Sequence, residues 1–444
     1  MRGNGDSWRK YRWHWKCAEK TVLTEKLIHY FRQIPDYRCG REKRHDLGEM
    51  LVCVTLGFLC GRTTIRRSLK WCKTHLEELR KHMNLKYGIA SPSTITRMLN
   101  GIDEELALYA FMEWIGEIVE SRNTHLAIDG KALCGATEKT KGETTPMLLN
   151  VVETVRGLIL AQLPVDSKTN EITAIPELLK LLDISGSIVT IDAVGTQTAI
   201  MEQIHEQGGH FVLTVKKNQP EAYEEIHTFM DKLGAEDLKR KKGEAMDPGM
   251  KEFLEKYEEI SQMEKNRDRN EYRTCQICKD ASNLTKSQKE WPHVQSIGRI
   301  KQVRLPKEKD SQGNDVTPSK EEFLEKGSRR IPAPSAGEGA GKDVQCTALI
   351  SDLILTAEEL GSIKRMHWSI ENRLHHVLDD TFREDRSPAK KSRNNLSLIR
   401  KYAYNILRLA MYETGLANIM TEMMDCFCDN AALRERYVFQ GIAS

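Results

Sequence analysis

His125-Leu126-Ala127-Ile128-Asp129 is a short apolar run that ends at a carboxylate. Such a run is typical of a buried strand in a central sheet. Residues 187–192 have the same form and also end at an aspartate. Between them, residues 147–154 and 158–165 are two further apolar runs joined by a short turn, which predicts a β-hairpin.

The segments that follow the hairpin alternate between helical and extended patterns. Residues 174–182 and 196–206 have apolar residues at helical spacing, and residues 187–192 and 210–215 read as strands. Three strands followed by helix, strand, helix and strand predict an α/β fold, a mixed sheet with helices on both faces. This is the order found in ribonuclease H-like folds.

The N-terminal region is predicted to be all-helical. Helices are expected at 20–34, from the N-cap Asp46 to Cys60, and at 63–83, 95–99 and 103–120. The short helix opened by Ser91-Pro92 would fit a helix-turn-helix-like DNA reader, although any small helical bundle gives the same pattern. The candidate DNA contacts in this region are Arg66, Arg67 and Arg97.

In the second half of the chain, the predicted helices and strands are separated by more breaks and polar stretches. Residues 221–261 are charged and read as helical, with breaks at Gly234 and Pro248-Gly249. Strands are expected at 272–277, 296–305 and 344–350, a polar mobile loop at about 307–342, and helices at 356–381 and 394–412.

The charge of the chain is unevenly distributed. The formal net charge of +3 hides 21 Lys and Arg against 9 Asp and Glu in residues 1–100, and 46 against 55 in the remainder. A basic end joined to an acidic body suits a protein that neutralises phosphates with one part and holds divalent cations with another. A solvated helical face would explain the basic run equally well.

Composition excludes several classes of protein. The apolar run Leu51–Cys60 is too short to span a bilayer, and no signal peptide is recognised, so a bacterial cytoplasmic location is expected. Eleven cysteines at irregular spacing do not form a secreted disulfide framework. Cys275 and Cys278 have zinc-like spacing without a second pair, so buried thiols are the preferred reading.

Asp129 and Asp192 can converge at the edge of one sheet, and two converging acids favour a magnesium site. A third carboxylate from a packed helix is then expected, and Glu371 is the candidate. Turn or cap roles for the aspartates, and a surface role for the helix of Glu371, remain open alternatives. His375 and His376 point to different helix faces, so they are not expected to share an ion.

Other chemistries lack their motifs. The sequence has no G-x-S-x-G elbow, no Walker A loop and no G-x-G-x-x-G loop, so neither a serine hydrolase nor nucleotide-driven chemistry is indicated.

Several ordered motifs over roughly residues 22–412 resemble the H-repeat-associated family of bacterial insertion-sequence transposases. They are Asp129-Gly130-Lys131, Lys168–Leu179, Val189–Ala193, Lys217-Asn218-Gln219-Pro220, His367–Asn372 and Phe382-Arg383-Glu384-Asp385. Lys168, Asn170 and Glu171 are either neighbours of an active site or turn residues.

The resemblance implies a DDE-type, ribonuclease H-like catalytic domain interrupted by a β-rich insertion, with Asp129, Asp192 and Glu371 as its acidic triad. The domains expected on this basis are a basic tail (1–20), a helical and DNA-binding domain (21–121), the first part of the catalytic domain (122–220), the insertion (221–352), the last part with the catalytic helix (353–415) and a C-terminal tail (416–444).

The chain departs from related transposases at several motif positions. A Tyr-Arg-Glu-Lys signature often surrounds the catalytic Glu in relatives, and Lys364, His367 and Leu378 stand at its Tyr, Arg and Lys spacings here. Cys134 stands where the family commonly has Arg. Arg269, Glu271 and Arg273 match a family motif in the insertion but receive no role from their chemistry.

The activity that the resemblance implies is DNA transposition. Two Mg²⁺ ions, replaceable by Mn²⁺, would be held by Asp129, Asp192 and Glu371 for cleavage of DNA at the element's terminal inverted repeats and transfer of the 3′ hydroxyl to target DNA. The expected partner is DNA, with a homodimer assembled on it, and the expected backbone contacts are Lys131, Arg365, His367 and Asn372. The alternatives are an inactive or domesticated DNA-binding protein and a metal-dependent nuclease without strand transfer.

Overall fold

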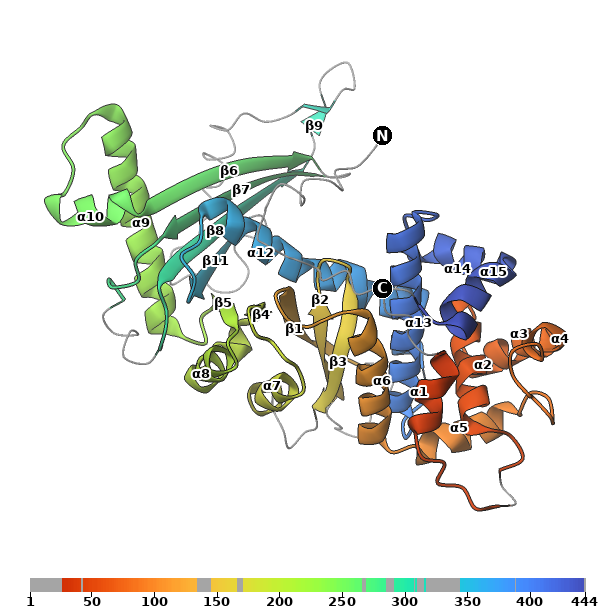
Figure 1. Cartoon of the computed structure of the whole chain (residues 1–444). Coiled ribbons are helices and arrows are strands. Elements are labelled where there is room, and N and C mark those ends of the chain that lie inside the picture. The colour runs from red at the N-terminus through yellow and green to blue at the C-terminus, as the bar shows by residue number, and fades with distance from the viewer. Residues whose placement is uncertain are drawn as a thin grey trace. The chain divides into compact units, whose positions relative to one another are not determined.

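The computed structural model in Figure 1 describes residues 26–40, 43–133, 145–165, 171–265, 269–284, 291–306, 308–309, 315–316, 344–387 and 389–442. The chain forms two compact units. Unit 1 comprises Met1–Ile188 and Trp368–Ser444, and unit 2 comprises Val189–His367. Each unit is described by itself. Among the helices of the described ranges, none is long and apolar enough to span a bilayer.

Unit 1 begins with short helices, which confirms the all-helical N-terminal region. They are α1 (Leu27–Gln33), α2 (Leu47–Leu59), α3 (Ile65–Thr74), α4 (Leu76–Leu79), α5 (Pro92–Gly101) and α6 (Glu104–Ile118). Asp46 caps α2 and Ser91 caps α5, each by accepting a hydrogen bond from the backbone three residues on. All thirteen residues of α2 are buried, so α2 is the core helix of this region.

Two of the helix boundaries in this region differ from those predicted. The single helix expected at 63–83 is interrupted at His75, which leaves the helical backbone conformation after α3. The helix expected at 95–99 is longer, because Pro92 occupies its first turn, where a missing N–H costs nothing.

Three antiparallel strands of unit 1 form the predicted hairpin and its neighbour. They are β1 (His125–Ala132), β2 (Met147–Glu153) and β3 (Leu158–Val165), in the order β3-β2-β1. Asp129 lies opposite Asn150, and Asn150 lies opposite Gln162, so these three residues form one row across the strands. The hairpin turns at Gly157, whose φ of +76° is readily adopted only by glycine.

Helices cover both faces of these strands. Asn150 and Gln162 of this row contact Lys401 of α13 (Arg393–Thr414). Gly130 points to the opposite face, where a Cβ atom would lie 2.4 Å from Oε1 of Glu171, the first residue of α7 (Glu171–Lys180). The mixed α/β class with helices on both faces is therefore confirmed.

Unit 2 carries the remaining strands in the order β4-β5-β11-β8-β7-β6. These are β4 (Ile188–Ile191, whose first residue belongs to unit 1), β5 (His210–Val215), β6 (Tyr257–Lys265), β7 (Arg269–Cys278), β8 (Ser296–Pro306) and β11 (Val344–Ser351). The antiparallel strands β6, β7 and β8 lie within residues 221–352, the range predicted as a β-rich insertion. The predicted loop at 307–342 lies outside the described residues except for β9 (Glu308–Lys309) and β10 (Asp315–Val316).

The predicted helical segment 221–261 was wrong in two places. Helix α9 (Pro220–Lys242) passes through Gly234 without a break and ends at Gly243, whose φ is +72°. Gly234 packs against Gln276 and Tyr257, which leave no room for a larger side chain there without adjustment. Residues 257–261 belong to β6 rather than to a helix. The other elements of unit 2 are η4 (Ala193–Gly195), α8 (Thr198–Glu206), η5 (Pro248–Met250) and α10 (Lys251–Glu255).

The C-terminal segments begin with α12 (Ala357–Ile370) and continue, in unit 1, as two wider π-helical turns, η6 (Glu371–His375) and η7 (Val377–Thr381). Next come η8 (Glu384–Arg386) and α13, which lies against α2 and α6 in Figure 1. The segment expected as a C-terminal tail is helical, with α14 (Met420–Asp429), α15 (Ala431–Arg434) and η9 (Glu435–Gln440).

Candidate active site

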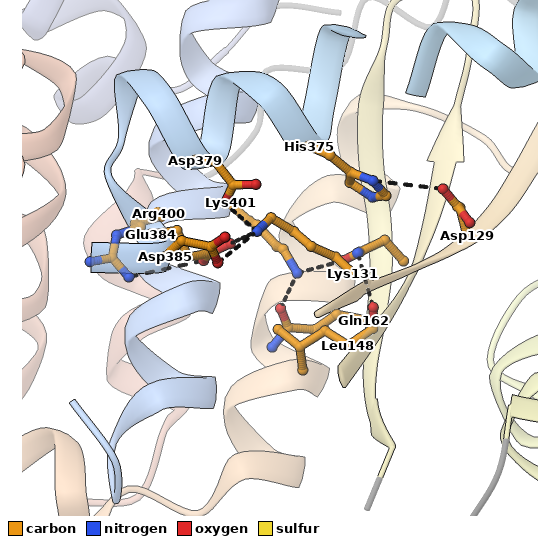
Figure 2. A network of polar contacts seen from close by, with 11 residues as sticks. Asp129, Lys131, Leu148, Gln162, His375, Asp379, Glu384, Asp385, Arg400 and Lys401 are labelled. Carbon is orange, nitrogen blue, oxygen red and sulfur yellow. Dashed lines mark hydrogen bonds and ion pairs between the residues drawn. The ribbon is translucent and has the colours of Figure 1, made fainter. Parts of the chain in front are cut away.

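Asp129 lies near the middle of β1 in unit 1, and its side chain is 28% exposed. Its Oδ1 accepts a hydrogen bond of 3.0 Å from the backbone of Gly130. Its Oδ2 lies 3.6 Å from Nδ1 of His375, as Figure 2 shows. Asp129 is therefore accessible to a ligand and is contacted on each of its two carboxylate oxygens.

Glu371 is the first residue of the π-helical segment that contains His375, and its side chain is exposed. Glu371, His375 and Asp379 follow one another at intervals of four residues, which brings them to the same side of a helical turn. His375 and Asp379 contact β1 at Asp129 and Lys131 respectively. Within unit 1, the exposed Glu371 thus lies about one helical turn before His375, the residue of this segment that contacts Asp129.

Lys131 is buried, in contrast to the expected phosphate contact. It is 4% exposed, and its ammonium contacts the Asp379 carboxylate and lies 3.5 Å from Glu384 Oε2 and 3.4 Å from Asp385 Oδ1. Burial lowers the pKa of Lys131, but the three carboxylates outweigh this effect and raise its pKa above the ordinary value. Lys131 is engaged inside unit 1 and is not available to a DNA backbone.

A second buried lysine lies behind the row of Asp129, Asn150 and Gln162. Lys401 Nζ donates a hydrogen bond of 2.5 Å to Asn150 Oδ1. It donates a second one of 2.5 Å to Gln162 Oε1 (Figure 2). Burial lowers the pKa of Lys401 to about 7. Sequence reasoning missed this contact, because the spacing of residues in α13 does not reveal which strand they meet.

Glu171, the first residue of α7, lies beside Gly130, the residue after Asp129: a Cβ atom on Gly130 would lie 2.4 Å from Glu171 Oε1. Lys168, Asn170 and Cys134 lie outside the described residues.

Asp192 directly follows β4 in unit 2. Lys216 contacts its side chain, and Asn218 contacts the backbone of the next residue. Lys216 Nζ lies 2.8 Å from Asp192 Oδ2, and the Asp192 side chain is 43% exposed. Burial raises the pKa of Asp192, but the hydrogen bonds from Lys216 and the Ala193 backbone and the charges of Lys216 and Lys364 together outweigh it, so the pKa is lowered. Asn218 Nδ2 donates a 3.0 Å hydrogen bond to the Ala193 carbonyl, which holds the turn that follows Asp192.

Lys364 and His367 of α12, which stand at the Tyr and Arg spacings of the Tyr-Arg-Glu-Lys signature, contact other residues of unit 2. His367, an expected DNA contact, is 6% exposed, with Nδ1 3.0 Å from Thr190 Oγ1. Lys364 donates a 2.8 Å hydrogen bond to Thr214 Oγ1. Arg365 is partly exposed and forms an ion pair of 2.9 Å with Glu264.

The remaining expected DNA contacts lie on the surface. Arg66 and Arg67 of α3, Arg97 of α5 and Asn372 of η6 are exposed. These side chains are available to a partner.

Glu271 and Arg273, two residues of the family motif on β7, form a buried polar network with the neighbouring strand. Glu271 Oε2 accepts hydrogen bonds of 2.8 Å from Arg273 and 2.9 Å from Gln302 on the neighbouring strand β8. Glu271 is 2% exposed, so these bonds satisfy a buried carboxylate between two strands. The side chain of Arg269 lies outside the described residues.

The cysteine pair of β7 consists of buried thiols. Burial raises the pKa of both Cys275 and Cys278 to about 11, which opposes the thiolate form that zinc requires. Residues three apart on a strand also point to opposite faces. Within the described residues, no group of three or more His, Cys, Asp or Glu side chains is gathered closely enough to hold a metal ion.

Comparisons with known proteins identify the family. Residues 28–115 match the model of the DDE_Tnp_1-associated domain, and residues 120–406 match the model of the transposase DDE domain. The H repeat-associated putative transposase YhhI of Escherichia coli (strain K12) is 28% identical over 388 residues, which cover 86% of this chain and 90% of YhhI. YbfD of the same strain, described in the same words, is 32% identical over 196 residues, which cover 44% of this chain and 78% of YbfD.

Among solved structures, a piggyBac transposase synaptic complex with hairpin DNA matches with a TM-score of 0.38 and 11% identity, over 93% of this chain and 78% of that chain. The domain model alone spans more than half of the sequence, and the strand and helix order of residues 125–215 is the one predicted for a ribonuclease H-like domain. The chain belongs to the family of transposases with a DDE domain.

Proposed function

We propose that this chain is an insertion-sequence transposase that cleaves DNA at the ends of its element and transfers the 3′ hydroxyl to target DNA. Asp129, Asp192 and Glu371 are the proposed catalytic residues and hold the divalent metal, two Mg²⁺ ions in the working complex, with Mn²⁺ as a substitute. The observation that supports the proposal is the 3.6 Å approach of Asp129 to His375, four residues after Glu371, within a match to the transposase DDE domain.

The chemistry of these side chains suits a hard divalent cation. All three donors are carboxylates, the ligands that Mg²⁺ prefers. Asp129 and Asp192 are partly exposed and Glu371 is exposed, so each is open to an incoming ion. The lowered pKa of Asp192 keeps it ionised at neutral pH. When bound, the metal ions would supply stabilisation of charge on the attacking and leaving oxygens of the phosphoryl transfer.

The surrounding residues suggest how DNA is held. Exposed Arg66, Arg67 and Arg97 are proposed to contact DNA phosphates from the helical domain at residues 21–121, which lies in the basic part of the chain. Arg365 and Asn372 are proposed contacts close in sequence to Glu371. Residues 122–220 and 353–415 are proposed as the two parts of the catalytic domain and 221–352 as its insertion. Pairing of two element ends implies a homodimer on DNA.

The proposal is tested with purified full-length protein, Mg²⁺, a labelled DNA end from the element and a target plasmid. We expect cleavage of an uncut end and joining of a precut end to the plasmid. Both reactions should be lost in Asp129→Asn, Asp192→Asn and Glu371→Gln, because each amide removes a charged metal ligand.

The result separates three classes of protein. Cleavage without joining would indicate a nuclease that lacks strand transfer, and binding without either reaction would indicate a DNA-binding protein derived from a transposase. Cleavage that persists in the two Asn variants would overturn the proposed triad. Asp380→Asn is the matched control, because Asp380 is an exposed carboxylate whose nearest charged partner is His376, at 3.5 Å.

A further inference from the structure

Two residues of β1 contact the helical segment that follows Glu371 at two successive points. Asp129 and Lys131 are two positions apart on the strand, so their side chains emerge on the same face. His375 and Asp379 are four positions apart on the π-helical segment and also share a face. The contacts pair Asp129 with His375 and Lys131 with Asp379, as Figure 2 shows.

We propose that Lys131 and His375 are positioning residues that hold Asp129 and Glu371 in register for metal binding. Lys131 anchors the segment after Glu371 to β1, and the His375 ring packs beside the carboxylate of Asp129. This inference rests on the proposed function and adds two residues that act through the metal ligands.

The Lys131 contact is an anchor because it is buried and multiply paired. The ammonium is surrounded by carboxylates from two successive elements, Asp379 of η7 and Glu384 and Asp385 of η8. Removing one partner of a buried ion pair leaves uncompensated charge, which is costly in a low-dielectric interior. Loss of the lysine would leave three neighbouring carboxylates to repel one another and would release the segment from β1.

Arg400 belongs to the same buried cluster from the other side. It is 3% exposed and lies 3.9 Å from Glu384 Oε1. Glu384 is therefore flanked by a cation from β1 and a cation from α13. The cluster ties η8 to both β1 and α13.

His375 is placed to restrain Asp129 rather than to contact DNA. Its side chain is 16% exposed, and Nδ1 is the ring nitrogen that faces Oδ2 of Asp129. The other ring nitrogen, Nε2, is buried without a hydrogen-bond partner among the described residues. The neighbouring His376 is 69% exposed and pairs with Asp380, so it provides a matched control on the same segment.

The first experiment measures Mn²⁺ binding to full-length protein by calorimetry and by electron paramagnetic resonance, without DNA. His375→Leu should weaken Mn²⁺ binding by about 10- to 100-fold, the range typical of residues that orient metal ligands. His375→Asn, which keeps a donor at the position of Nδ1, should recover most of the affinity. His376→Leu should bind as the unaltered protein does, and metal-free DNA affinity should stay within about twofold in all three.

The second experiment measures hydrogen exchange of residues 371–381 and the Mg²⁺ concentration needed for half-maximal cleavage. Lys131→Met should speed exchange in this segment and raise the Mg²⁺ requirement, whereas Lys131→Arg should restore both, because it keeps the cation. Asp380→Asn, an exposed change on the same segment, should leave both unchanged. Thermal unfolding identifies any variant that fails to fold, and the conservative variants then decide the outcome.

The outcomes separate the inference from the proposed function. If the unaltered protein binds Mn²⁺ and cleaves DNA, and His375→Leu and Lys131→Met do the same with equal affinity and exchange, the inference is overturned and the proposed function stands. If the unaltered protein neither binds Mn²⁺ nor cleaves, the proposed function fails and the role of His375 fails with it. The Lys131 anchor is then judged by exchange alone, and equal exchange in Lys131→Met overturns it.

Discussion

Lys216 Nζ lies 2.8 Å from Oδ2 of Asp192, so a proposed metal ligand is paired with a cation of its own unit. Both side chains are about half exposed. The ion pair favours the charged form of Asp192 and so lowers its pKa. An incoming metal ion must therefore compete with the Lys216 ammonium for the Asp192 carboxylate.

Lys216→Ala should therefore tighten Mn²⁺ binding at pH 7. The expected gain is about two- to fivefold, because exposed ion pairs contribute about 0.2–1 kcal/mol. Calorimetric titration of the full-length variant with Mn²⁺ measures it. Lys217→Ala is the control next in sequence, and weaker binding in Lys216→Ala would show that the lysine assists the metal instead of competing with it.

Gly57→Ala should destabilise unit 1. A Cβ atom at Gly57 of α2 would lie 2.1 Å from Cβ and 2.5 Å from Cα of Ser68 on α3, and a backbone cannot move aside as a side chain can. Overpacking of this kind costs about 1–3 kcal/mol, occasionally more. Urea unfolding checks the prediction.

Gly116→Ala is the matched control for this change. Gly116 lies in α6, where an added Cβ meets nothing within 4 Å. Alanine in an open helical position stabilises by up to about 1 kcal/mol. If both variants unfold at the same urea concentration, the close packing of α2 against α3 is refuted.

Lys401→Met should change how stability depends on pH. The folded-state pKa of about 7 lies below the ordinary value of 10.5, so between these two pH values the unfolded chain binds more protons than the folded chain. Stability attributable to this group then rises with pH across that window, and the penalty for burying the charge is fully present below it. The methionine variant should lose this rise.

Denaturant unfolding at several pH values from 6 to 10 measures the effect. Lys70→Met on the exposed side of α3 serves as the control and should keep the pH profile of the unaltered protein. An unchanged slope in Lys401→Met would mean that Lys401 is not a buried titrating group.

Arg434→Ala should detach the C-terminal helices from the N-terminal ones. Its guanidinium donates hydrogen bonds of 3.0 and 2.8 Å to Glu78 Oε1 and one of 2.8 Å to the Cys428 carbonyl. The Arg434 side chain is 4% exposed but the Glu78 side chain is 28% exposed, so the loss should fall below the cost of about 3–5 kcal/mol for a fully buried pair. Thermal unfolding should report the loss.

The control for this variant is Arg436→Ala. Arg436 is 50% exposed and pairs with Glu413 at 2.8 Å. Exposed pairs contribute about 0–1 kcal/mol, so this change should barely move the melting temperature. Equal destabilisation by both variants would contradict a buried anchor at Arg434.

Regular elements with a clear apolar period were predictable from the sequence. The strands at 147–154, 158–165 and 210–215 and the capped helix after Asp46 appear within a few residues of their predicted bounds. Local patterns suffice there because short apolar runs bounded by turn residues are typical of buried strands, and a longer apolar run after an N-cap is typical of a buried helix. Gly234 was misread as a break, because its packing against Gln276 and Tyr257 stabilises a helix that local propensity alone would interrupt.

The candidate acidic residues were identified from the sequence, but the side chains that contact the predicted site residues were not. Lys131 was expected at a phosphate and is buried among carboxylates from a segment about 250 positions later in the chain. His367 was expected at DNA and is buried against Thr190. Neither contact leaves a local signal, because the partner is chosen when distant elements pack.

The sequence by itself determined the family, the α/β order of elements and the three candidate carboxylates, since these depend on local period and on ordered motifs. Tertiary structure alone decided that His375 faces Asp129, that Lys131 is an internal cation and that Lys401 lies beneath Asn150 and Gln162. The physical reason is that burial and pairing energies depend on which side chains meet across elements. That meeting is set by the packing of helices on strands and not by the spacing of residues along either one.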